Sequence, residues 1–183
     1  MLYQHFYYCL RSYFYVFVYT IWLKRKTPQN IVIGGASGAL PPVIGWAIAT
    51  NSISLESIAF FLIIFFWTPS HFWALSLYKA DDYKKAGIPM LPVTNGIQDT
   101  KKNILIYSLL MIPTIVFPYY IGFVGEVFLT LSLLLTFYYN LICYQLYNYK
   151  VGKFNIKKAR HIFSYSIIYL FLIFVFFLVD KVL

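Results

Sequence analysis

Charged side chains are scarce in this sequence, and acidic ones are the scarcest. Only 11% of the 183 residues are charged, and six acids stand against fifteen lysines and arginines. Because 61% of the residues are hydrophobic, the composition excludes a soluble domain with an ordinary polar surface. The net charge of +9 does not indicate nucleic-acid binding, which would need a basic face on a polar protein.

Cysteine is also nearly absent. Cys9 and Cys143 lie far apart in apolar segments, so the sequence indicates neither a disulfide framework nor a cysteine metal site. No basic residues precede the first apolar run and no small-residue cleavage site follows it, so a signal peptide is not indicated. Because the sequence also lacks a linker or low-complexity stretch, residues 1–183 are predicted to form a single domain.

Long apolar runs are what the sequence has in abundance. Most of them reach the roughly 20 residues with which a helix crosses a hydrocarbon core of about 30 Å. The runs are continuous rather than alternating, which excludes the strands of a membrane barrel. The sequence therefore predicts an all-α fold, a polytopic transmembrane helical bundle with six spans. The runs cover residues 6–23, 31–50, 57–78, 104–122, 124–147 and 162–179.

The cations follow the predicted topology. Thirteen of the fifteen lysines and arginines fall around residues 24–26, 79–102 and 150–160, which are alternate connections between spans. The remaining turns, at residues 51–56 and around Gly125, contain none. By the positive-inside rule the basic loops face the cytoplasm or the mitochondrial matrix. We therefore expect a bacterial or mitochondrial inner-membrane protein with its active site on that side.

The second apolar run combines glycines with a pair of prolines. Gly34 and Gly38 have the spacing that lets two helices approach closely, and Pro41 and Pro42 are expected to bend or break the span. The GGASG stretch lacks the lysine and hydroxyl of a phosphate-binding loop. We interpret its glycines as packing residues.

Two of the six acids, Asp81 and Asp82, stand side by side at a predicted membrane surface. Adjacent carboxylates are natural ligands for Mg²⁺, which commonly bridges protein carboxylates to a substrate phosphate. Lysines such as Lys84 could neutralise a departing diphosphate. The alternative is a solvated loop in which acids and lysines balance. The following AGIPMLPV stretch, residues 86–93, favours the first interpretation, because it is apolar and fixed by two prolines.

His71 is an ionisable residue inside a predicted span, and such a residue is a functional hypothesis by default. On one continuous helix Tyr78 and Asp82 would share its face, with Asp82 about 16 Å along the axis. One face of this helix would then connect the buried imidazole of His71 to the carboxylates. Two alternatives stay open: a neutral histidine hydrogen-bonded to a neighbouring helix, and a ligand of haem iron.

A third segment of interest covers residues 19–30, where aromatic residues end a span and cations follow. An ordinary interfacial belt with snorkelling lysines explains most of it. Asn30 is harder to explain in this way, because a polar amide at the entrance of a span needs a partner.

Three segments together resemble the protohaem IX farnesyltransferases (haem O synthases) of the UbiA superfamily of intramembrane prenyltransferases. The resemblance covers the chain from about Tyr15. It implies nine spans around a cavity open to lipid. It also implies transfer of a farnesyl group from farnesyl diphosphate to a vinyl group of haem B, with addition of water, to give haem O for haem A biosynthesis. The segments are YTIWLKRKTPQNIVIGGASGALPPVIGW, WTPSHFWALSLYKADDYKKAGIPMLPV and RHIFSYSIIYLFLIFVFFLVD.

The resemblance also implies roles for individual residues. Asp81 and Asp82 match the second carboxylate motif and would act in catalysis by holding Mg²⁺ against the diphosphate. The basic loop would stabilise the leaving diphosphate, and other matched residues face the cavity. The substrate-binding residues predicted in this way are Lys24, Arg25, Asn30, His71, Tyr78, Tyr83 and Lys84.

The first carboxylate motif of the family has no counterpart, because no acid precedes Glu56. We therefore expect the chain to be the C-terminal two thirds of such an enzyme, with an N-terminal partner fragment. The other expected partners are farnesyl diphosphate, haem B, the lipid bilayer and a haem O-to-A converting enzyme, but no nucleic acid. The alternative functions are a prenyltransferase of aromatic quinone precursors, a non-catalytic remnant or haem-binding membrane protein, and a transporter.

Overall fold

The computed structural model describes residues 13, 16–17, 26–149 and 156–182, and all the helices named below lie in these ranges. The predicted first span, residues 6–23, lies outside the described residues except for three positions, as do Lys24 and Arg25. No strand occurs in the described part of the chain. The helices are α2 (Asn30–Thr50), α3 (Leu55–Tyr78), α4 (Ala80–Lys85), α5 (Leu91–Thr94), α6 (Ile97–Tyr120), α7 (Glu126–Tyr147) and α8 (Ile156–Val182).

Five of these helices, α2, α3, α6, α7 and α8, are long and apolar enough to cross a membrane. They confirm the five predicted spans that the structure describes. The largest differences are at the starts of α6 and α8, which begin about two turns before the apolar runs. Those early turns carry lysines and therefore extend the helices out of the hydrocarbon layer.

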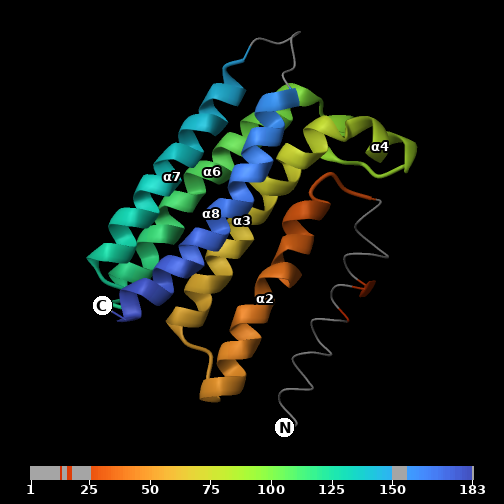
Figure 1. The fold of residues 1–183 in the computed structure, drawn as a ribbon. Helices are drawn as coiled ribbons and strands as arrows, with labels where there is room; N and C mark the ends of the chain where they lie inside the picture. The colour runs from red at the N-terminus through yellow and green to blue at the C-terminus, as the bar shows by residue number, and fades with distance from the viewer. Residues whose placement is uncertain (1–12, 14–15, 18–25, 150–155, 183) are drawn as a thin grey trace.

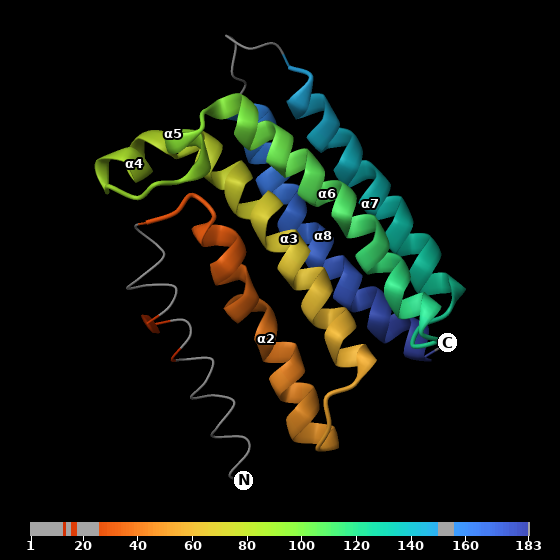
Figure 2. The ribbon, with the colours of Figure 1, turned by 180° about the vertical axis from the view of Figure 1, so that it is seen from behind.

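Four helices close into a bundle in which α3 and α7 each contact both α6 and α8 (Figure 1). Helix α2 lies on the outside and, among the described elements, packs only against α3 (Figures 1 and 2). Polar pairs cross the bundle interior. The hydroxyls of Ser70 and Tyr139 lie 2.8 Å apart, and those of Thr136 and Tyr169 lie 2.9 Å apart. These four hydroxyls are thereby paired with one another inside the bundle.

The two ends of the bundle differ in charge. One end, the basic end, holds α4, α5 and the starts of α2, α6 and α8, at the top of Figure 1. Every described lysine and arginine except Lys181 lies there. The opposite end holds the acids Glu56, Glu126 and Asp180. The described basic segments therefore share one side of the bundle, as the sequence predicts.

The structure of α2 bears on two predicted details, its prolines and its glycines. The sequence predicts that the prolines bend or break the span; the helix continues through Pro41 and Pro42, so no break occurs, and the bend stays a prediction. Transmembrane helices tolerate proline where neighbouring groups satisfy the freed backbone. The close approach to α3 is made at Gly35, where a Cβ would lie 3.1 Å from Thr68 Cγ2. A Cβ at Gly38 would meet nothing within 4 Å, so Gly38 makes no close approach to a described helix, and the predicted role of Gly34 stays a prediction.

Candidate functional site

The carboxylate pair lies on α4, a separate short helix at the basic end. Helix α3 ends at Tyr78, and Lys79 leaves the helical conformation with φ −113° and ψ 18° before α4 begins. The predicted continuous helix face from His71 to Asp82 is therefore wrong. Asp81 and Asp82 occupy the first turn of α4, where carboxylates are favoured by the partial positive charge of a helix start. This preference favours starting a new helix over continuing α3.

Both aspartates are exposed, and one of them has a cationic partner. Lys79 Nζ lies 3.0 Å from Asp82 Oδ2, and their side chains are 53% and 62% exposed. An exposed pair of this kind contributes little stability. Within the described ranges, no group of three or more histidine, cysteine or acidic side chains is placed to hold a metal ion. Asp81 and Asp82 are thus accessible from outside the bundle.

The segment after α4 is anchored to the bundle, as its apolar composition predicts. Gly87 adopts a left-handed conformation with φ 66°, and the Ile88 N–H donates to the backbone oxygen of Tyr83 at 3.0 Å. Met90 and Leu91 are buried. Tyr83 packs half-buried against the core, and burial raises the pKa of its hydroxyl, which therefore stays protonated. These contacts fix α4 at the end of α3.

His71 lies at membrane depth with its ring enclosed. It is 7% exposed, and its imidazole stacks between the rings of Trp67 and Phe163, at centroid distances of 4.2 Å and 4.6 Å. His71 Nδ1 is 2.6 Å from the Ser166 hydroxyl oxygen on α8. The predicted alternative of a histidine hydrogen-bonded to a neighbouring helix is therefore confirmed for Nδ1. Among the described residues, Nε2 has no hydrogen-bond partner.

Tyr78 shares the face of His71, and both contact the same residue of α8. The Tyr78 ring meets Phe163 edge-on at 6.1 Å. The guanidinium carbon of Arg160 lies 5.4 Å from the centre of the Tyr78 ring. The sequence predicts for Arg160 only a charge in the basic connection 150–160, not this contact at the end of α3. Its position at the start of the RHIFSYS segment was the available signal.

The other predicted residues do not gather at one point. Asn30 is buried at the first residue of α2, and Lys84 is exposed on α4. Lys24 and Arg25 lie outside the described residues. The structure therefore brings His71 and Tyr78 together with Arg160, and holds the carboxylates on the neighbouring short helix.

A cavity of about 270 Å³ lies between α2 and α3. Its lining is mainly apolar and includes Trp67 and Phe72, whose rings both contact His71. The absence of side chains at three glycines leaves the space on the α2 side. The cavity could therefore hold an apolar group beside the imidazole. Its lining residues are Ile31, Gly34, Gly35, Gly38, Ile64, Trp67, Thr68 and Phe72.

Comparison with known proteins identifies the family. The model of the UbiA prenyltransferase family matches residues 4–167 of this chain. The chain belongs to that family. As a UbiA prenyltransferase it is an integral multi-pass membrane protein, and the candidate residues all lie within the matched range.

Curated relatives of this UbiA prenyltransferase include three bacterial proteins named protoheme IX farnesyltransferase. The one from Pelagibacter ubique is 76% identical over 170 residues, which is 93% of this chain and 56% of that protein. The one from Parvibaculum lavamentivorans is 49% identical over 171 residues, 93% of this chain and 54% of that protein. The one from Azorhizobium caulinodans is 52% identical over 162 residues, 88% of this chain and 53% of that protein. The chain thus spans about half the length of the curated relatives it matches, and no solved structure matches it.

Proposed function

We propose that this chain takes part in transferring the farnesyl group of farnesyl diphosphate to a vinyl group of haem B, which yields haem O. The observation that carries the proposal is the 76% identity to a protoheme IX farnesyltransferase over 93% of the chain. The geometry supports it, because accessible carboxylates at the basic end adjoin a helix with a buried histidine and an apolar cavity.

Asp81 and Asp82 would hold a divalent metal, Mg²⁺, with the diphosphate. Mg²⁺ usually keeps several waters and takes one or two protein carboxylates together with substrate phosphates, so this exposed pair fits it. The ion would neutralise charge on the leaving diphosphate. Cationic side chains at the same end, including Lys84 and Arg160, would attract and stabilise that anion. We assign the same role to Lys24 and Arg25.

In the proposed reaction the bond between farnesyl C1 and the diphosphate oxygen breaks, and the diphosphate leaves with the electron pair. C1 then forms a carbon–carbon bond to the haem vinyl group. The other vinyl carbon takes the hydroxyl of a water molecule, and a proton is released. The apolar cavity between α2 and α3 keeps water from farnesyl C1 until the carbon–carbon bond has formed.

His71 is assigned to the haem substrate. Its Nδ1 is engaged by Ser166, while Nε2 has no partner among the described residues and can meet the haem. The rings of Trp67 and Phe163 hold the imidazole plane in place. Tyr78, Tyr83 and Asn30 complete the proposed substrate contacts.

The basic end would face the cytoplasm, in the inner membrane of a bacterium. The product would pass to an enzyme that converts haem O to haem A.

The test uses a host that lacks its own haem O synthase. The host expresses the chain alone, or together with the part of the Pelagibacter ubique relative that the chain does not match. Haems are extracted and identified by chromatography and mass, with membrane insertion checked by blot. Haem O in either strain supports the proposal, and the comparison shows whether the chain suffices. If both strains make only haem B while the inserted chain is present, the proposed function is wrong.

A further inference from the structure

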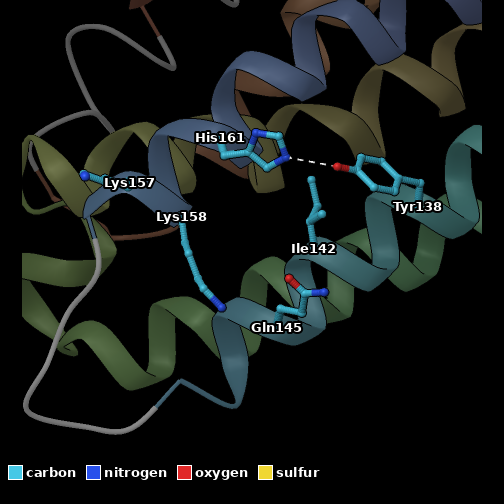
Figure 3. A pocket seen from close by; sticks show the side chains of 6 residues that line it. All are labelled: Tyr138, Ile142, Gln145, Lys157, Lys158 and His161. Carbon is cyan, nitrogen blue, oxygen red and sulfur yellow. Dashed lines mark hydrogen bonds between the residues drawn. The ribbon is translucent and has the colours of Figure 1, made fainter.

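A second cavity, of about 260 Å³, opens between α7 and α8 at the basic end. It shares no lining residue with the candidate site, although His161 directly follows Arg160 on α8. Figure 3 shows side chains from both helices around it. They are Tyr138, Ile142, Gln145, Lys157, Lys158 and His161.

The cavity is lined mainly by polar side chains, together with the apolar side chain of Ile142. The Lys158 amine extends toward the end of α7 near Gln145 and lies 4.9 Å from the centre of the Tyr149 ring, whereas Lys157 points away from α7 (Figure 3). His161 Nε2 lies 3.2 Å from the Tyr138 hydroxyl oxygen. Ile142 lies between these groups. An ammonium, an amide, an imidazole and a phenol thus surround one small space.

The charge of this cavity is not balanced by a carboxylate. Helix α8 has no acid in its first turn. In the described part of the chain the one ion pair joins Lys79 to Asp82, so no carboxylate pairs with Lys158 or His161. The start of a helix carries a partial positive charge, which makes it a poor place for lysine and a good one for an anion. The arrangement therefore favours a bound anion.

The surroundings show what kind of anion fits. Along α7 and α8, away from the basic end, large apolar side chains point outward, including Phe137 at 72% and Phe171 at 67% exposure. Phe171 lies about 20 Å from Lys158 along α8, at a rise of about 1.5 Å per residue. The cavity thus lies where the helices pass from the interface into the hydrocarbon layer. A free inorganic anion would not contact the apolar surface beside the cavity, whereas the acyl chains of a lipid would.

We propose that this cavity binds the phosphate headgroup of an anionic membrane lipid, with the acyl chains lying against the outer faces of α7 and α8. Basic pockets between transmembrane helices on the cytoplasmic side are suited to such headgroups. Lys158 supplies the charge, and Gln145 and Tyr138 supply hydrogen bonds to phosphate oxygens.

The test measures binding of phosphatidylglycerol and phosphatidylcholine to the purified chain by native mass spectrometry in detergent. We expect one phosphatidylglycerol molecule to bind in preference to phosphatidylcholine. Lys158→Gln should weaken its binding about tenfold, the effect of losing one charge-assisted hydrogen bond. The matched control is Lys102→Gln, which removes an exposed lysine of α6 at the same end. Gln145→Leu is a second variant that keeps the charge.

Each outcome decides the proposal. Weaker binding of phosphatidylglycerol by Lys158→Gln and Gln145→Leu than by the control supports the lipid site. Equal phosphatidylglycerol binding by Lys158→Gln and the wild type overturns it. Competition by inorganic phosphate, with no preference between the two lipids, would identify an ion site instead of a lipid site. Displacement of phosphatidylglycerol by lower concentrations of farnesyl diphosphate would assign the cavity to the prenyl substrate, which also overturns it.

A crosslinking measurement tests the position of the acyl chains independently of any variant. Phosphatidylglycerol with a photoreactive diazirine in its acyl chain is added to the wild-type chain and activated, and the labelled peptides are sequenced. The proposal predicts labels on the outer faces of α7 and α8, between residues 134 and 141 and between 167 and 171. Labels confined to other helices would contradict it.

Discussion

His71 Nδ1 lies 2.6 Å from the Ser166 hydroxyl oxygen, and that hydroxyl lies 2.6 Å from the backbone oxygen of Phe163. A serine hydroxyl has one hydrogen to donate. Both contacts exist together only when Ser166 donates to Phe163 and the His71 Nδ1–H donates to Ser166. The lone pair of His71 is then on Nε2, the nitrogen that can act as an acceptor or ligand toward a substrate.

The first prediction concerns this serine. Ser166→Ala leaves the buried His71 Nδ1–H without an acceptor, which costs about 1–3 kcal/mol. We expect a lower unfolding temperature in detergent and weaker binding of haem B, measured by absorbance titration. Ser166→Thr keeps the hydroxyl and should restore both. Ser164→Ala, an exposed position on α8, is the matched control. Wild-type stability and haem binding in Ser166→Ala would contradict the assigned tautomer.

The second prediction compares the effects on stability of alanine substitutions at two glycines of α2. In Gly35→Ala the new Cβ would lie 3.1 Å from Thr68 Cγ2, so the Thr68 side chain or α2 must shift by a few tenths of an ångström. In Gly38→Ala the methyl group meets nothing within 4 Å. We expect the first variant to unfold at lower temperature, by about 1–3 kcal/mol for overpacking, and the second to match the wild type. Equal thermal stabilities would show that α2 and α3 are not in close contact at Gly35.

The third prediction concerns the end of the bundle opposite the basic end. The Asp180 carboxylate on α8 accepts hydrogen bonds from the backbone N–H groups of Gly125 at 2.7 Å and Phe128 at 3.1 Å. It therefore caps the start of α7. Asp180→Ala should cost about 0.5–2 kcal/mol, the usual range for losing a cap. Hydrogen exchange should accelerate at these two amides, and Glu126→Gln should leave them protected. Unchanged exchange in Asp180→Ala would exclude the cap.

The fourth prediction tests the cation that lies over Tyr78. If Arg160 stabilises the diphosphate, Arg160→Gln in a preparation that makes haem O should raise the KM for farnesyl diphosphate roughly ten- to a hundredfold. The physical reason is the loss of a charge-assisted contact worth about 1.5–3 kcal/mol. Lys102→Gln removes a cation of the same end and should have no effect on this KM. If Arg160→Gln leaves this KM unchanged, Arg160 does not bind the diphosphate and contributes only to the charge of the basic end.

The large-scale features could be predicted because they depend on local composition. Spans follow from apolar length, and the basic end follows from the positions of lysine and arginine. The anchoring of residues 86–93 followed in the same way from their apolar, proline-fixed composition. Met90 and Leu91 are indeed buried against the bundle.

The details that could not be predicted depend on partners far away in the sequence. The contact of Asp180 with Gly125 joins residues 55 positions apart, and that of His71 with Ser166 joins residues 95 apart. The break at Lys79 was missed for another reason. Helical periodicity alone places Asp82 on the face of His71, but it does not show that carboxylates favour the start of a new helix.

The central claim is that the carboxylate pair of α4 acts in prenyl transfer, and one measurement tests it most directly. The host that lacks haem O synthase expresses the chain, alone or with the complementary part of the Pelagibacter ubique relative, whichever strain produces haem O. Haem O in its membranes is then quantified for the Asp82→Asn and Asp99→Asn variants. Asp99 is an exposed acid in the first turn of α6 at the same end. Because the Lys79–Asp82 pair is exposed, its loss should not affect membrane insertion. We predict that Asp82→Asn loses haem O production at least about a hundredfold, the several kcal/mol expected of a metal ligand, while Asp99→Asn retains it. Wild-type haem O production by an inserted Asp82→Asn chain would contradict the account.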